Sequence, residues 1–183
     1  MKKVILFLAL LLVATASTAQ DLAKKWELHL KLGSQTYLNT LDPDPGSAAL
    51  GGLHLGYNLS NRSMFGIHSA TAGYEITYFD GSTESKSVNS FLFTYRYSFR
   101  VEKKFRPYLE GGGGIVDPII GYDTGKKAAL TLALGAKYWF ASKWSFFIES
   151  RGVGWMQDDT FNVQGYDIEV ASNEFTIGVS RLF

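Results

Sequence analysis

The chain contains no cysteine among its 183 residues. No disulfide framework can therefore hold the fold together. A lipoprotein carries its lipid on an N-terminal cysteine, so the missing cysteine also excludes that class. Backbone pairing and side-chain packing must stabilise this fold without covalent cross-links.

Apolar runs long enough to cross a membrane as a helix are also missing. The run Val4–Ala16 is shorter than the ~20 apolar residues that a membrane-spanning helix needs. It follows Lys2 and Lys3, and small residues at positions 17–19 come after it. This pattern predicts a secretory signal peptide over residues 1–19 and a mature domain over residues 20–183.

The chain has almost no excess of charge of either sign, with a formal net charge of +1. Nucleic-acid binding depends on a strong positive charge, so nothing here favours nucleic acid as a partner. Beyond the signal peptide no segment shows a sustained helical period, and the remaining length is that of one domain.

What the chain does have is strict alternation between two kinds of side chain. Between residues 91 and 101 the odd positions are aromatic or β-branched, and the even positions include Arg96 and Arg100. A period of two predicts a β-strand with two different faces. Ten steps of ~3.3 Å, tilted by ~40°, rise about 25 Å, which matches the apolar band of an outer-membrane barrel. The apolar positions are Phe91, Phe93, Tyr95, Tyr97, Phe99 and Val101.

Similar alternation predicts seven more strands. They lie near residues 25–36, 48–59, 64–79, 106–114, 130–140, 146–151 and 175–183. Short turns follow the second, fourth and sixth strands, and longer polar loops follow the others, as in outer-membrane barrels. Because an open sheet edge cannot face hydrocarbon, the sheet must close on itself. We therefore predict an all-β fold, an eight-stranded antiparallel transmembrane β-barrel with up-and-down topology and both termini in the periplasm.

The third predicted strand has an irregular pattern. Its apolar residues begin at odd positions with Phe65 and Ile67, but Tyr74 is even. A strand cannot switch faces without an irregularity, so we expect a β-bulge between Gly66 and Gly73. The alternative is that the upper half of the strand projects beyond the membrane.

Two short segments carry a resemblance to a known family. Residues 106–114 read Arg-Pro-Tyr-Leu-Glu followed by four glycines, and the chain ends on Gly-Val-Ser-Arg-Leu-Phe. With these segments the mature chain resembles the small outer-membrane β-barrel proteins of the OmpA/OmpX-like kind. The resemblance implies a place in the outer membrane of a Gram-negative cell, in contact with membrane lipid. It also implies that the barrel-assembly machinery reads the C-terminal pattern, which Phe183 and Val179 match and Arg181 does not.

Charged residues of both signs share the inward parity of the predicted strands. An eight-stranded interior is just wide enough for side chains to fill. A salt-bridged polar network that plugs the lumen is one interpretation, and a gated pore is the other. The inward charged residues are Glu27, Lys31, Arg96, Arg100, Glu110, Lys137, Glu149 and Arg151.

Three histidines also have inward parity. His29, His54 and His68 fall on successive strands at similar predicted heights. Neighbouring strands lie ~4.8 Å apart, so the imidazoles could converge on a metal ion or titrate together. The alternative is that they are ordinary polar filling, and we predict neither a metal nor another cofactor.

Catalysis has one weak candidate. Ser69 follows His68, with Glu75 nearby, but adjacent strand residues point to opposite faces and cannot readily share a proton. We therefore predict no enzymatic activity and a structural, adhesive or surface-binding role. The alternatives are a lipid A-modifying enzyme, a narrow channel and a soluble periplasmic barrel, the last disfavoured by the inward charges. A surface ligand could contact the loops through Asp42, Asp44, Asp158, Asp159, Phe161 and Tyr166.

Overall fold

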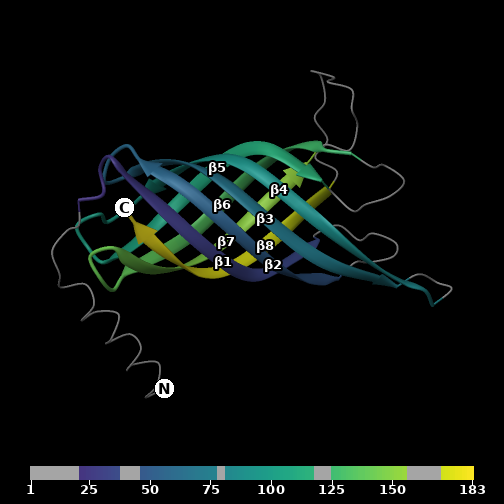
Figure 1. Cartoon of the computed structure of the whole chain (residues 1–183). Coiled ribbons are helices and arrows are strands. Elements are labelled where there is room, and N and C mark those ends of the chain that lie inside the picture. Colours follow the sequence, from purple (N-terminus) through teal and green to yellow (C-terminus); the bar gives the residue numbers. More distant parts are fainter. Residues whose placement is uncertain (1–20, 38–45, 78–80, 118–124, 156–169) are drawn as a thin grey trace, which may run out of the picture.

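The computed structural model describes residues 21–37, 46–77, 81–117, 125–155 and 170–183. The predicted signal peptide lies outside these residues. Among the described residues, no helix is long and apolar enough to cross a membrane. The eight strands are β1 (Lys25–Tyr37), β2 (Ser47–Asn58), β3 (Ser63–Thr77), β4 (Thr83–Ser98), β5 (Phe105–Asp117), β6 (Lys127–Trp139), β7 (Trp144–Trp155) and β8 (Val170–Leu182) (Figure 1).

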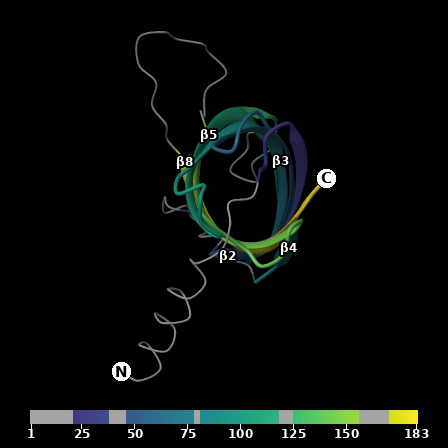
Figure 2. The ribbon, with the colours of Figure 1, turned by 90° about the vertical axis from the view of Figure 1, so that its left-hand side faces the viewer.

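The strands form one closed barrel. Each strand pairs antiparallel with the next, and β8 pairs with β1. Seen from one end, the ribbon closes into an oval ring (Figure 2). The predicted fold class is thus confirmed. We call the end with the short β2–β3, β4–β5 and β6–β7 connections the turn end, and the opposite end the loop end.

The alternation in sequence becomes the inside and the outside of the barrel. In β4, Phe91, Phe93 and Tyr95 are 40%, 59% and 41% exposed, whereas Leu92 and Thr94 between them are buried. The same separation runs through β2, β6 and β7. Because the sheet is closed, its buried side faces the lumen and its exposed apolar side faces outward.

Strand β3 keeps one register throughout. It pairs residue for residue with β2 from Met64 to Gly73 and with β4 from Ser63 to Thr77, so the predicted bulge is wrong. Along this regular strand Met64 and Tyr74 are both buried. The outward face turns polar from Ser69 onward instead, which agrees with the other explanation, that the upper half rises beyond the apolar band.

Strand β4 ends earlier than predicted. It stops at Ser98, and Arg100 lies exposed in the following turn with a positive φ of 51°. The Lys103 N–H donates to the Arg100 carbonyl oxygen at 3.0 Å, which closes this turn. The alternation in sequence runs on past the last paired residue and so overstates the strand. At its other end β4 begins at Thr83, inside the segment predicted as a polar loop.

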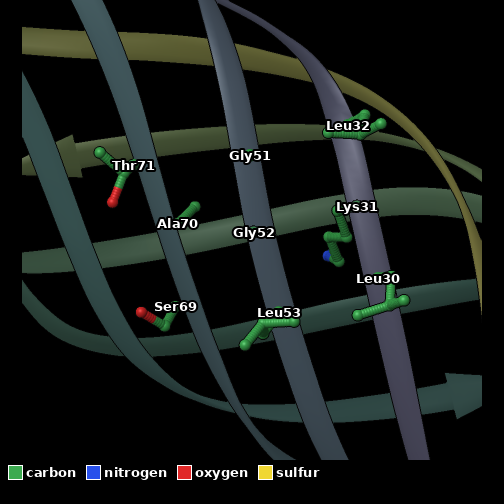
Figure 3. Close-up of a pocket in the computed structure, with 9 residues that line it drawn as sticks. All are labelled: Leu30, Lys31, Leu32, Gly51, Gly52, Leu53, Ser69, Ala70 and Thr71. Atoms are coloured by element: carbon green, nitrogen blue, oxygen red, sulfur yellow. The ribbon is translucent and has the colours of Figure 1, made fainter.

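The outer surface has a groove over β2. Gly51 and Gly52 form its floor, and a side chain at Gly51 would meet no atom within 4 Å. Figure 3 shows Leu30 and Leu32 of β1 on one side and residues 69 and 71 of β3 on the other. Leu30, Leu32 and Leu53, which are exposed, place the groove on the outer side of the barrel wall.

Candidate functional site in the lumen

Charged side chains gather in the middle of the lumen. Four carboxylates and four cations are buried there, so their formal charges cancel. Six of the eight strands, all except β2 and β3, contribute to this group, which we call the charged layer. Its ionic members are Glu27, Lys31, Arg96, Glu110, Lys137, Glu149, Arg151 and Glu174.

Arg151 of β7 contacts three of the four carboxylates. Its Nη2 atom donates to Glu110 Oε1 and, at 3.0 Å, to Glu149 Oε1. Its Nε atom lies 3.8 Å from Glu174 Oε2, and its Nη1 atom donates to Thr131 Oγ1 at 3.2 Å. The guanidinium therefore links β5, β6, β7 and β8 across the lumen through charge-assisted contacts.

Arg96 of β4 holds the neighbouring part of the layer. Its Nε atom donates to Glu110 Oε2 at 2.7 Å, and its Nη2 atom lies 3.5 Å from Glu149 Oε2. The guanidinium carbon lies 3.9 Å from the centroid of the Tyr108 ring, and the Tyr108 hydroxyl donates to Glu149 Oε2 at 2.8 Å. The arginine is thus stacked on an aromatic ring and paired with two carboxylates.

The two lysines complete the pairing. Lys31 donates to Glu149 Oε1 at 2.5 Å, and Lys137 donates to Glu27 Oε1 at 2.5 Å. The Ser180 hydroxyl also donates to Glu27. Every cation of the layer therefore contacts at least one carboxylate, which is the condition for stable burial of charge.

The structure places seven of the eight predicted inward charges in this layer. Arg100 is the exception, and its predicted lumen position is wrong because β4 has ended before it. Two members were missed. Glu174 lies on β8, which begins five residues earlier than the predicted strand. Tyr108 belongs to the segment that carries the family resemblance, and its sequence position predicts no role in the lumen. The inward parity of Glu174, next to outward Phe175, is the signal that could have found it.

The three histidines lie side by side inside the barrel. His54 is the direct cross-strand partner of both His29 and His68, and the ring centroids are 4.9 and 6.3 Å apart. His54 Nδ1 lies 3.3 Å from Arg96 Nη2, while His29 and His68 lie 3.5 and 3.7 Å from glutamate oxygens. Among the described residues no group of three His, Cys, Asp or Glu side chains is placed to hold a metal ion. We interpret the histidines as part of the charged layer.

An apolar layer lies between the charged layer and the loop end. It includes two large aromatic side chains, Tyr74 and Trp155, both almost fully buried. The Tyr74 hydroxyl donates to Gln35 Oε1 at 3.1 Å, so its one polar atom has a partner. The other members of this layer are Ala48, Leu50, Ala70, Ala72, Val88, Leu92, Val116, Ala129 and Val153.

A smaller apolar cluster lies on the other side, at the turn end. It consists of Leu22, Trp139 and Leu182, all buried. The ammonium of Lys137 lies 5.3 Å from the centroid of the Trp139 ring and connects this cluster to the charged layer. The Leu22 N–H donates to Asn61 Oδ1 at 2.6 Å, which fixes the segment before β1 over this end.

The remaining predicted residues lie elsewhere. His68 is buried in the lumen and Ser69 is exposed on the outside, so the two do not form a catalytic pair. Phe183 is 58% exposed, and its N–H donates to the Trp26 carbonyl oxygen at 2.9 Å. Val179 pairs with Leu30. The loop residues Asp42, Asp44, Asp158, Asp159, Phe161 and Tyr166 lie outside the described residues.

Comparison with known proteins identifies the class of barrel. The family model for the outer membrane protein beta-barrel domain matches residues 5–183. Among solved structures, Neisserial surface protein A has a TM-score of 0.66 and 15% identity, over 86% of this chain and 97% of its own. The N-terminal β-barrel domain of Pseudomonas aeruginosa OprF has a TM-score of 0.56 and 16% identity, over 90% and 100%. The comparison with curated proteins gives no match.

Proposed function

The chain belongs to the outer membrane protein β-barrel domain family, and from this premise we propose that it is a closed structural barrel that presents surface loops. In this proposal it spans the outer membrane, contacts lipid with its exposed apolar face, and neither conducts solutes nor catalyses a reaction. Its signal peptide is residues 1–19, and the barrel-assembly machinery reads Phe183 and Val179 at the end of β8.

The filling of the lumen carries this proposal. Side chains occupy its middle as a charge-balanced layer, and apolar side chains lie on both sides of that layer. An ion passing through would have to displace Tyr74 and Trp155 and then separate the pairs around Arg151. Removing a partner from such a buried pair costs about 3–5 kcal/mol, so an open state is strongly disfavoured.

The surface role is supported by the unequal connections. The turn-end connections are short, whereas the β7–β8 connection spans residues 156–169. Such long external loops on a rigid scaffold are where binding residues concentrate in many proteins. The name of Neisserial surface protein A places that barrel at a cell surface. We propose the same exposure for the loops of this chain.

Conductance tests the closed lumen. The purified barrel, inserted in planar lipid bilayers, is expected to give no stepwise current, while a porin in the same bilayers gives large steps. Trp155→Ala is expected to remain closed because the charged layer below it is intact. If the wild type gives current steps and Trp155→Ala gives larger ones, ions pass through the lumen and the proposal is contradicted.

Lipid A analysis tests the absence of catalysis. We expect the lipid A of a Gram-negative host to have the same acylation pattern with and without expression of the barrel, measured by mass spectrometry. Ser69 lies on the opposite face of β3 from His68, so this hydroxyl does not have the imidazole within reach as its base. A new acyl form that disappears in Ser69→Ala would establish the enzymatic alternative.

A further inference from the structure

The two ends of the barrel carry opposite charge. The three short turns, residues 59–62, 99–104 and 140–143, contain five basic residues and one acidic residue, Glu102. The four connections of the loop end contain eight acidic residues and one basic residue, Lys126. The net charge of +1 hides this separation. The basic residues of the short turns are Arg62, Arg100, Lys103, Lys104 and Lys143.

At the turn end, which carries the basic residues, one more cation lies on the outer surface of the barrel. Arg181 of β8 is exposed on the outer surface and is the cross-strand partner of Trp144. Its guanidinium carbon lies 5.3 Å from the centroid of the Trp144 ring and 5.0 Å from that of Phe183. The Leu182 N–H donates to the Lys143 carbonyl oxygen at 2.8 Å, so the exposed Lys143 lies in the turn next to the Trp144–Arg181 pair. The Arg181 guanidinium and the two aromatic rings therefore share one small area, and the Lys143 backbone adjoins it.

In the part of the chain that the structure describes, neither Arg181 nor Lys143 is paired with an acidic group, because no Asp, Glu or C-terminal carboxylate there forms a salt bridge with either side chain. By contrast, Arg62 at the same end lies 3.8 Å from Glu102. A cation at the membrane surface without a counter-charge attracts anionic groups from the lipid. The planar guanidinium is suited to bind two phosphate oxygens at once.

The wall above this area is apolar. Going up the barrel from Arg181, Phe146 pairs with Val179 and Ile148 pairs with Ile177. Phe146 and Ile177 are 53% and 57% exposed on the outer face. A continuous apolar strip over β7 and β8 thus starts directly beside the two cations. This order, a cationic site followed by an apolar strip, complements a phospholipid with its headgroup at the turn end.

We propose that Arg181 and Lys143, flanked by Trp144 and Phe183, bind the phosphodiester of an anionic glycerophospholipid. The lipid belongs to the leaflet at the turn end, and its acyl chains lie along the strip formed by β7 and β8. The site explains why a charged residue interrupts the apolar alternation at the end of β8. It requires the membrane location of the barrel and does not depend on the closed lumen.

Native mass spectrometry of the folded barrel tests the site. Wild-type protein in a neutral detergent is titrated with dioleoylphosphatidylglycerol or with dioleoylphosphatidylcholine. We expect one phosphatidylglycerol to bind about tenfold more tightly than phosphatidylcholine. The double variant Arg181→Gln/Lys143→Gln is expected to lose this preference.

A matched variant separates the site from general attraction. Arg62→Gln/Lys103→Gln removes the same amount of positive charge from the turn end. It keeps Arg181 in place beside Trp144 and Phe183. It is expected to keep the preference for phosphatidylglycerol. The unboiled band on SDS gels checks that both variants are folded. Equal losses in the two double variants, or a wild type without preference, would overturn the proposal.

Discussion

Replacing Arg151 by methionine is expected to lower the free energy of unfolding by about 3–5 kcal/mol. The substitution keeps an unbranched, space-filling side chain but removes the donors that Glu110, Glu149 and Glu174 share. Three carboxylates would then compete for the remaining cations inside a lumen where water is scarce. Urea unfolding in lipid vesicles, followed by tryptophan fluorescence, measures the loss.

Two further variants identify the cause of that loss. Ser150→Ala changes the neighbouring, outward-facing residue and is expected to stay within about 0.5 kcal/mol of the wild type. Glu110→Gln combined with Arg151→Met removes one of the stranded charges, so the double variant should be less destabilised than the sum of the single ones. Strict additivity would mean that the two side chains do not interact, contrary to the hydrogen bond between them.

Gly112→Ala is expected to prevent formation of the barrel. Gly112 of β5 faces the lumen side of the wall, and a Cβ atom there would overlap the carbonyl oxygen of Phe93 in β4. That oxygen belongs to the paired backbone and cannot move without breaking the β4–β5 ladder. The heat-modifiable band of the folded barrel on SDS gels should be lost, along with protection from added protease.

The neighbouring glycine supplies the control. A Cβ atom at Gly111 would have its nearest neighbour, the Thr131 carbonyl oxygen, at 3.7 Å, which is ordinary van der Waals contact. Gly111→Ala should therefore fold normally, with a stability within about 0.5 kcal/mol of the wild type. The two variants carry the same glycine-to-alanine change at adjacent positions of β5. If both folded equally well, close backbone approach would not be the reason for the glycine run.

The architecture could be predicted from sequence because alternation is a local signal. In β4 the aromatic positions 91, 93 and 95 and the inward Arg96 are recognisable without any knowledge of the neighbouring strands. The ends of strands depend on pairing, which is not local. Arg100 continues the alternation of β4 yet lies in a turn, because its segment has no partner there. The regular course of β3 depends in the same way on its register with β2 and β4.

The interior was predicted only in part for a related reason. Charged residues at inward positions stand out, so seven members of the charged layer were found from parity alone. Inward apolar residues such as Leu50, Leu92 and Val153 resemble imperfections in the alternation. Only the closed barrel shows that these residues meet in a layer with Trp155. The Arg181 area was likewise visible only as an exception to the C-terminal pattern.

The partners in the charged layer are far apart along the chain, and this has a consequence for assembly. Lys31 and Glu149 are separated by 118 residues, Lys137 and Glu27 by 110, and Ser180 and Glu27 by 153. A partly inserted sheet would therefore hold unpaired charges in hydrocarbon, at a cost of several kcal/mol for each central charge. Insertion and closure are thus expected to occur as one concerted step, with no stable species of four or six strands.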